Sequence, residues 1–225
     1  MTIAVLSWGS HKTLTQSLKS YQKYGLDTLD EDRVIFFQEY SEEDKAIAEE
    51  FNWESIGSPT NIGIAEAYKL LVAFATDDLF LFLENDWELI EKPHKQISEA
   101  ADLLKNHEAD VIRLRHRDNP GEPLYSRQFK GHENTSPQHM LDCVHWDKHP
   151  ENFAQIEKIG NWYLASSRYA NWTNNPTMFR TGFLREFIVP RMSGDIEKAI
   201  QPWWAQNDFY VMQGQGLFTH NRIDR

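Results

Sequence analysis

The strongest constraint on the fold is a regular alternation of apolar runs and amphipathic stretches in the first half of the sequence. Four short apolar, β-prone runs predict strands at residues 3–8, 34–38, 79–83 and 110–114. Stretches with helical periodicity separate and follow these runs, at residues 11–24, 41–51, 61–76 and 93–107. Alternating strands and helices are typical of a mainly parallel sheet covered by helices. The sequence therefore predicts an α/β fold.

Ligands of such a sheet bind beyond the carboxyl ends of its strands. In this sequence Ser7 and Trp8 end the first apolar run, Glu39 follows the second, and residues 84–87 follow the third. We therefore expect a functional site to draw on these positions.

The segment after the third run carries two carboxylates, Glu84 and Asp86, two residues apart. In an extended segment, side chains at i and i+2 point the same way, so both carboxylates can converge on one site. Hard oxygen ligands of this kind suit Mg²⁺ or Mn²⁺ that also bridges phosphates. The alternative is a polar turn after a strand without any ligand, since loops are surface elements.

A second feature is the segment Asn61-Ile62-Gly63, which opens the helical stretch before the acid pair. Glycine lets the backbone come close to a ligand, and a helix N-terminus attracts anions. The alternative is that Asn61 merely caps the helix.

The order of these elements resembles the GT-A glycosyltransferases. The matching features are the first strand, the Asn-x-Gly before an Ala-rich helix, and the apolar strand that ends in acid-x-acid. The family's metal motif is usually Asp-x-Asp, whereas this chain has Glu84-Asn85-Asp86, a departure that affects the role of Glu84 more than that of Asp86. The segment Gly216–His220 also resembles the family's late histidine segment. The short chain is similar to compact GT-A domains of large algal viruses.

The resemblance implies a single GT-A-like (Rossmann-like) domain over residues 1–225, with a mainly parallel central sheet flanked by helices. Residues 1–115 would bind a nucleotide-sugar and residues 116–225 an acceptor. Asp86 would bind Mn²⁺ or Mg²⁺, which holds the donor diphosphate, and His220 would complete the coordination. The alternative for His220 is an ordinary exposed histidine near the end of the sequence. The residues expected to contact the donor are Ser7, Trp8, Glu39, Asn61, Gly63, Glu84 and Asn85.

An inverting transferase also needs a general base for the acceptor hydroxyl. The family usually places an acid at the start of a helix or strand in the acceptor half, which makes Asp208 the expected base. Asp195 and Glu197 are rival candidates on the preceding helical stretch. The alternative is that Asp208 only caps or pairs.

The second half of the sequence is less regular. Residues 116–139 are polar and predict a long loop, and a helix is expected over 194–204. His145 and His149 are four apart but lack a third zinc ligand, and Cys143 is read as a small apolar residue.

The composition of the chain limits the kinds of partner and the cellular compartment that we expect. The net charge is −11 and the pI about 5.3, which argues against nonspecific nucleic-acid binding because such binding needs a basic face. No run approaches the ~20 apolar residues of a membrane span, and the first residues do not resemble a signal peptide. The single cysteine, Cys143, excludes an intrachain disulfide and favours a reducing compartment, so we expect a cytoplasmic protein.

The expected function is metal-dependent transfer of a sugar from a nucleotide-sugar, uridine-linked, to a hydroxyl acceptor such as a glycan. A sugar nucleotidyltransferase is one alternative, but residues 7–12 do not form its glycine-rich, basic phosphate loop. A non-catalytic carbohydrate-binding module is the other, and it leaves the acid pair and Asn61 unexplained. That module would use aromatic platforms at Trp162, Tyr163, Trp172 and Trp203.

Overall fold

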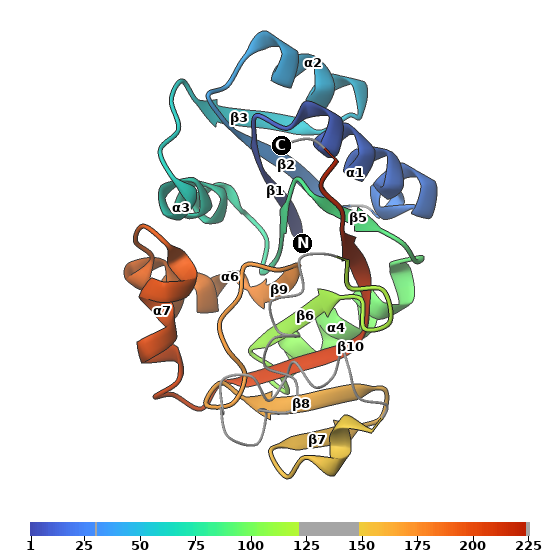
Figure 1. Cartoon of the computed structure of the whole chain (residues 1–225), viewed down its shortest axis with the longest axis vertical. Coiled ribbons are helices and arrows are strands. Elements are labelled where there is room, and N and C mark those ends of the chain that lie inside the picture. The colour runs from blue at the N-terminus through green and yellow to red at the C-terminus, as the bar shows by residue number, and fades with distance from the viewer. Residues whose placement is uncertain (30, 122–148, 224–225) are drawn as a thin grey trace.

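The computed structural model describes residues 1–29, 31–121 and 149–223, and within them a ten-stranded mixed sheet carries helices on both faces (Figure 1). The order of strands across the sheet is β3-β2-β1-β4-β9-β6-β10-β8-β7, and β5 pairs with β10. The strands are β1 (Thr2–Trp8), β2 (Asp32–Gln38), β3 (Glu54–Ser58), β4 (Leu79–Glu84), β5 (Trp87–Leu89), β6 (Val111–Arg115), β7 (Ile156–Ile159), β8 (Trp162–Ser166), β9 (Thr177–Arg180) and β10 (Tyr210–His220).

The longer helices begin and end close to the residues that the sequence predicts. The α-helices are α1 (His11–Tyr24), α2 (Glu42–Glu50), α3 (Ile64–Phe74), α4 (His94–Lys105), α6 (Thr181–Phe183) and α7 (Ile196–Trp204). Short 3₁₀ segments occur at η1 (Leu26–Thr28), η4 (Pro150–Asn152) and η6 (Val189–Arg191), and a π-helical segment at η5 (Leu184–Ile188).

Local signals explain the ends of the first two helices. α1 ends at Gly25, whose φ of 86° is the left-handed conformation that glycine adopts without steric cost. α2 begins after Ser41, which forms a capping box with Asp44. These signals were readable in the sequence, and the predicted helix limits agree with the structure there.

The two faces of the sheet have separate cores because alternate residues of a strand point to opposite sides. On β4, Phe80 and Phe82 pack on the face covered by α3 and α7, while Leu79, Leu81 and Leu83 pack on the face covered by α1, α2 and α4. Burial on both faces explains the continuous apolar run in β4.

The directions of the strands decide which strand ends lie together at one edge of the sheet. β1, β2, β3 and β4 are mutually parallel, so their carboxyl ends share one edge of the sheet. β9 runs antiparallel between β4 and β6, and β10 is parallel to β6. β10 therefore runs in the same direction as β4 and brings its last residue, His220, toward the same edge.

The predicted α/β fold class is confirmed, although the sheet is parallel in its N-terminal part and mixed beyond it. β3 was not predicted, because this edge strand is polar and half-exposed and lacks an apolar run. The expected loop over 116–139 lies mostly outside the described residues, as do Cys143 and His145.

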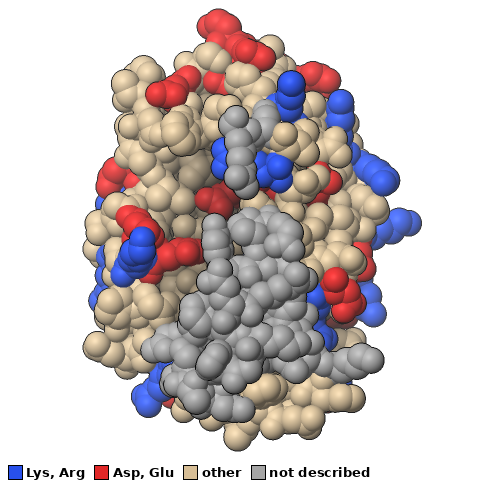
Figure 2. All heavy atoms as spheres, viewed as in Figure 1, with Lys and Arg blue, Asp and Glu red and all other residues tan. Residues whose placement is uncertain are grey.

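The surface adds two observations. No helix among the described residues is long and apolar enough to cross a membrane. On the face shown in Figure 2, Lys and Arg side chains are scattered among Asp and Glu, and the described residues there form no broad basic surface.

Candidate active site

The acid segment after β4 is held against the end of β1. Leu6 pairs with Glu84 in the parallel ladder, and the Asn85 backbone N–H donates to the Leu6 carbonyl at 3.0 Å. The Asn85 side-chain amide donates to Ser7 Oγ at 3.3 Å, and Ser17 Oγ donates to the Asn85 carbonyl at 2.8 Å. Asn85 and Ser7, both expected at the donor site, thus also fix the shape of the turn that presents the two carboxylates.

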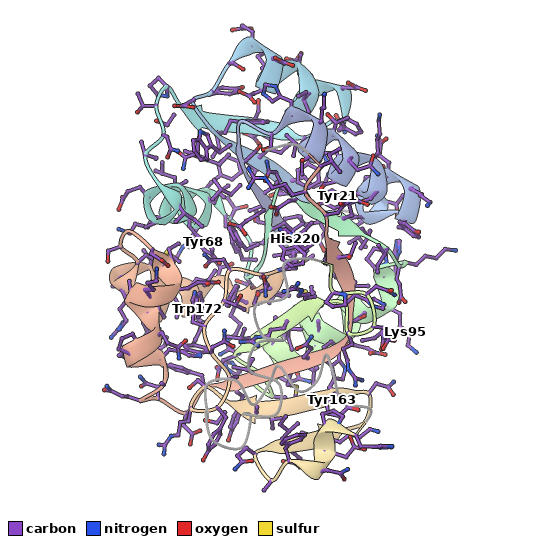
Figure 3. All side chains as sticks on the ribbon, viewed as in Figure 1. Tyr21, Tyr68, Lys95, Tyr163, Trp172 and His220 are labelled. Atoms are coloured by element: carbon purple, nitrogen blue, oxygen red, sulfur yellow. The ribbon has the colours of Figure 1, made fainter. Side chains whose placement is uncertain are left out.

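Asp86 and His220 come together although they lie far apart in the sequence. His220 stands opposite Trp87 in the antiparallel pair of β10 with β5, which places the imidazole beside the preceding residue, Asp86. His220 Nε2 lies 3.1 Å from Asp86 Oδ2, and both side chains are largely buried. The Trp87 ring packs edge-on against the imidazole at 5.0 Å between ring centroids. Figure 3 shows His220 near the centre of the molecule, between the upper and lower parts of the fold.

The other Asp86 oxygen makes this pair suitable for a cation. Asp86 Oδ1 is buried, and no hydrogen-bond donor within the described residues reaches it. A buried carboxylate oxygen without a partner is costly unless something else satisfies it. A carboxylate oxygen and an imidazole nitrogen can both bind a divalent cation, which makes the pair a candidate for holding one in place of the contact between His220 Nε2 and Asp86 Oδ2.

Few protein ligands are available for such a cation. The described part of the chain contains no group of three or more His, Cys, Asp or Glu side chains placed to hold a metal. Mg²⁺ and similar hard cations are often bound by one or two protein groups, with substrate phosphates and water completing the shell. The donor set at Asp86 and His220 suits this second kind of site.

Glu84 lies half-buried beside this pair. Burial is the main cause that raises the pKa of Glu84 to about 8; the negative charges of Asp86 and Glu197 contribute to this rise, and the positive charge of Arg222 opposes it. Glu197 and Arg222 thus both act electrostatically on this carboxylate. Arg222, which also donates to Ser10 Oγ at 3.3 Å, was missed at the sequence level, where its only signal is a cation two residues after His220.

An exposed aromatic side chain lies at the neighbouring strand end. Trp8 is 53% exposed, the one strongly exposed Trp among the described large apolar residues. Its indole Nε1 donates to Glu39 Oε2 at 2.9 Å. Glu39 has a φ of 58°, a conformation that non-glycine residues rarely adopt and that is often found at functional sites. Together they present a fixed, flat surface that a planar ring can stack on.

The Asn61–Gly63 segment has a different local role from simple capping. Asn61 Oδ1 accepts a hydrogen bond from the Gly63 N–H at 2.8 Å, and Gln38 Oε1 accepts one from the Ile62 N–H at 2.8 Å. The N-cap of α3 is Gly63 itself, with a φ of 81° that favours glycine, and no side chain of the described residues caps this helix. The N-terminus of α3 is thus open near the carboxyl ends of β2 and β3.

Asp208 lies elsewhere. It immediately precedes the first residues of β10, and its Oδ1 accepts a short hydrogen bond from Ser166 Oγ. The whole of β10, with an irregularity between Gln213 and Phe218, separates it from His220 along the chain. Asp208 and the Asp86–His220 pair thus lie at opposite ends of β10, and the role of Asp208 as the general base stays a prediction.

The two alternative candidates for the general base, Asp195 and Glu197, have different partners in the structure. Asp195 caps α7 through the Lys198 N–H and pairs with Lys198 Nζ at 2.7 Å. Glu197, in the first turn of α7, accepts a hydrogen bond from the Asn174 N–H at 2.9 Å and affects the pKa of Glu84. Of the three acids, Glu197 is the one whose charge acts on Glu84.

Most of the predicted aromatic platforms are packed in the core. Trp162 and Trp172 are buried, and Trp172 lies edge-on against Trp204 with ring centroids 5.1 Å apart. These rings stabilise the lower part of the fold, so they do not form the row of exposed platforms expected of a carbohydrate-binding module.

Comparison with solved structures identifies the fold. No family model and no curated protein sequence matches the chain. S. aureus TarS 1-349 in complex with UDP-GlcNAc has a TM-score of 0.62 at 14% identity, over 100% of this chain and 60% of that one. The mannosyltransferase PcManGT from Pyrobaculum calidifontis, in complex with GDP-Man and Mn²⁺, has a TM-score of 0.63 at 10% identity, over 100% of this chain and 57% of that one.

A third solved structure has a different activity. A nucleotidyl transferase from Methanothermobacter thermautotroptrophicus has a TM-score of 0.51 at 9% identity, over 95% of this chain and 86% of that one. The chain spans about 60% of the length of the two transferases above. At these identities the similarity shows a GT-A-like fold, and function must be argued from the site.

Proposed function

We propose that this chain is a metal-dependent glycosyltransferase that moves a sugar from a nucleotide-sugar to a hydroxyl acceptor such as a glycan. The observation that carries the proposal is the Asp86–His220 pair at the carboxyl edge of the sheet, with the buried Oδ1 of Asp86 left for a ligand. UDP is the nucleotide that we expect.

The donor is proposed to lie along the carboxyl ends of β1, β2 and β4. Trp8 would stack on the nucleobase, with Glu39 holding the indole in place. The backbone amides at the start of α3, after Gly63, would face anionic groups of the donor. Arg222 would add a positive charge near the diphosphate and near Glu84.

Asp86 and His220 would hold Mn²⁺ or Mg²⁺. A divalent cation bound there offsets the negative charge that develops on the leaving diphosphate. Asp86 would supply a carboxylate oxygen and His220 its Nε2 nitrogen. The two side chains are already positioned by β4 and β10, so little ordering cost remains for binding.

For an inverting reaction, we propose Glu197 as the general base in place of Asp208. Its carboxylate is exposed on α7, in the acceptor half, and its charge affects Glu84 in the donor half. The hydrogen bond from the Asn174 N–H orients Glu197 Oε1 and leaves its other oxygen to accept a proton from the acceptor hydroxyl.

A sugar nucleotidyltransferase is the second candidate, favoured by the similarity to the Methanothermobacter structure. That reaction joins a nucleoside triphosphate to a sugar phosphate and releases pyrophosphate. It needs a loop after β1 that cradles the triphosphate, whereas residues 9–12 hold a single glycine and a single lysine.

The test is a screen of nucleotide-sugars for hydrolysis and transfer, with Mn²⁺ and with EDTA. We expect release of free nucleoside diphosphate from one donor in Mn²⁺ and none in EDTA. Pyrophosphate release from a nucleoside triphosphate and a sugar phosphate, without hydrolysis of any nucleotide-sugar, would favour the second candidate.

A further inference from the structure

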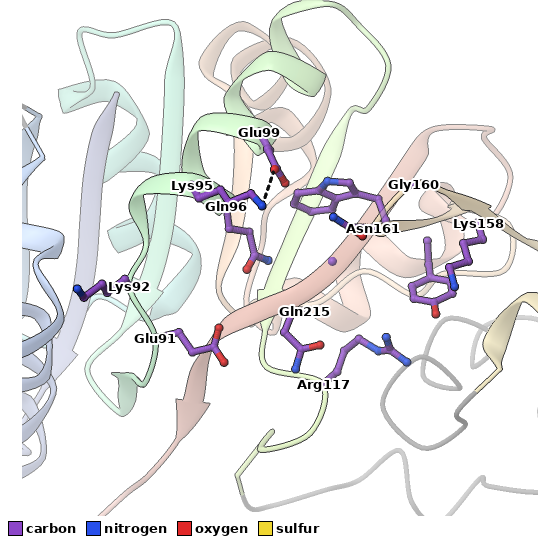
Figure 4. A pocket seen from close by; sticks show the side chains of 13 residues that line it. Glu91, Lys92, Lys95, Gln96, Glu99, Arg117, Lys158, Gly160, Asn161 and Gln215 are labelled. Atoms are coloured by element: carbon purple, nitrogen blue, oxygen red, sulfur yellow. Dashed lines mark ion pairs between the residues drawn. The ribbon is translucent and has the colours of Figure 1, made fainter.

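A cavity of about 440 Å³ lies outside the site described above, between α4, the β7–β8 hairpin and the middle of β10 (Figure 4). Its volume is in the range of small-molecule pockets. The cavity shares no residue with the Asp86–His220 pair, with Trp8 and Glu39, or with Asn61–Gly63.

The cavity is locally basic in an acidic protein. The chain carries a net charge of −11, yet four cationic side chains line this one cavity, against two acidic ones. The cations come from three parts of the sequence, and they are Lys92 with Lys95, Arg117, and Lys158. Figure 4 shows Lys95, Arg117 and Lys158 around the opening together with amide side chains, whereas Lys92 lies at its margin and points away.

The two acids are already engaged. Glu91 Oε1 lies 3.0 Å from His116 Nε2, and Glu99 Oε1 lies 3.9 Å from Lys95 Nζ. The Lys95–Glu99 pair is long and solvent-exposed, so it binds the lysine weakly. A ligand anion can therefore replace Glu99 as the partner of Lys95 at little cost.

The cavity walls are fixed by packing. Arg117 and Lys158 both lie over the Tyr163 ring, at 4.7 Å and 5.7 Å from its centroid, which holds both cations beside the opening. A Cβ on Gly214 would lie 3.1 Å from the Trp162 ring, so glycine lets this indole pack directly on the β10 backbone. A preformed wall lowers the ordering cost of binding.

Polar groups that recognise hydroxyls also line the cavity. Asn161 and Gln215 contribute side-chain amides, which both donate and accept hydrogen bonds. Gln215 Nε2 donates to Asp118 Oδ2 at 2.7 Å, which orients this amide at the cavity edge. Amides beside cations suit a ligand that carries both hydroxyls and an anionic group.

We propose that this cavity is a second binding site, and that it takes an anionic sugar, one that bears a phosphate or a carboxylate. The cations bind the anionic group, and the amides bind the ring hydroxyls. The site goes beyond the proposed transfer reaction, because its geometry does not involve the donor site or a metal.

The test is an NMR titration of the ¹⁵N-labelled full chain with glucose 6-phosphate and with glucuronic acid. We expect saturable shifts with both probes, confined to the signals of four residues that line the cavity, Gln96, Asn161, Trp162 and Gln215. Glucose and inorganic phosphate, titrated separately, should each bind at least about tenfold more weakly than the anionic sugars, since each lacks one of the two recognised groups. Equal binding of inorganic phosphate would overturn the sugar part of the proposal.

The matched variants are Lys95→Gln/Lys158→Gln and, as a control, Lys19→Gln/Lys45→Gln. The control removes two exposed lysines from α1 and α2, and Lys45 makes an i,i+4 pair with Glu49 at 3.9 Å, as Lys95 does with Glu99. We expect the first variant to weaken binding of both anionic sugars about tenfold or more and the control to change it less than about twofold.

Absence of saturable shifts, or equal affinity of the two double variants, would overturn the proposal. UDP affinity should be unchanged in the Lys95→Gln/Lys158→Gln variant. If the anionic sugars do not bind, the proposal for the donor site is therefore unaffected. If the transferase assay shows no activity, the titration still tests the second site.

Discussion

Acidic side chains lie beside both ends of β10, but their hydrogen-bonding environments differ. At the carboxyl end, His220 meets Asp86, whose Oδ1 is buried without a donor among the described residues. At the amino end, Asp208 is exposed and accepts from Ser166, and the neighbouring Asp110 accepts from the Tyr210 N–H at 2.9 Å. At the carboxyl end an Asp86 oxygen is left for a ligand to bind, whereas at the amino end Asp208 and Asp110 accept hydrogen bonds from the protein itself.

This difference in hydrogen-bond partners indicates which carboxylates are available to bind a ligand. A carboxylate that already accepts hydrogen bonds at the surface stabilises the local structure and has little reason to bind anything else. A carboxylate oxygen that is buried and unpartnered, at the edge where strands end, is held ready for a cation. The predictions below test this contrast with the same chemical change at each end.

The largest effect is expected for Asp86→Asn. The amide removes the charge that holds the cation, and a metal that stabilises a developing charge is worth several kcal/mol. We expect sugar transfer and nucleotide-sugar hydrolysis to fall by about 10³-fold or more, with the thermal unfolding temperature unchanged or raised. Turnover at saturating Mn²⁺ measures this, and parental turnover would remove Asp86 from the mechanism.

Glu197→Gln should come next if the reaction is inverting. General-base help is worth ~10²–10⁴-fold in rate, and its loss should lower kcat with little effect on donor affinity. Asp195→Asn is the control, because it changes a neighbouring acid that caps the same helix. Equal losses in the two variants would point to damage to α7 and not to a base.

His220→Ala should have a smaller effect, on metal affinity more than on kcat. We expect the Mn²⁺ concentration for half-maximal activity to rise by at least roughly 10–100-fold, the loss typical when even a residue that only orients a metal ligand is removed. His149→Ala is the control, since His149 is exposed and pairs only with Glu151 among the described residues. Overlapping Mn²⁺ titrations of the parent and His220→Ala would leave His220 without a metal role.

The smallest effect is expected for Asp208→Asn. Activity should stay within about threefold of the parent, because this side chain lies at the far end of β10. Stability should fall by no more than about 1 kcal/mol, from weakening of one exposed hydrogen bond. Denaturant unfolding and a transfer assay check both values, and a loss of activity comparable to that of Asp86→Asn would erase the contrast between the two ends.

Much of the fold was readable from the sequence. The capping box at Ser41, the glycine after α1 and the apolar run of β4 are local signals, and the elements begin and end near the predicted residues. β3 was missed because an exposed edge strand has no apolar pattern, and the π-helical segment Leu184–Ile188 has no sequence signature that distinguishes it from an ordinary helix.

The parts of the candidate site that could be predicted are those whose position follows from the order of neighbouring elements in the sequence. Glu84 to Asp86 follow a recognisable strand, so their edge of the sheet could be inferred. The position of Asp208 could not be predicted in this way. The edge of the sheet at which Asp208 lies depends on the direction of β10 relative to β4, and this direction is set by long-range strand pairing. Arg222 and Glu197 are far from Glu84 in the sequence and act on its carboxylate only because of the tertiary fold, so no local pattern marks them.

The central claim is that Asp86 and His220 hold a divalent cation that binds a nucleotide-sugar. Calorimetric titration of UDP into the full chain, in Mn²⁺ and in EDTA, tests it most directly, with Asp86→Asn and Asp208→Asn measured in parallel. We expect binding in Mn²⁺ that EDTA abolishes, that Asp86→Asn loses and that Asp208→Asn keeps. UDP binding of equal affinity in EDTA, or equal affinity of the two variants in Mn²⁺, would contradict the claim.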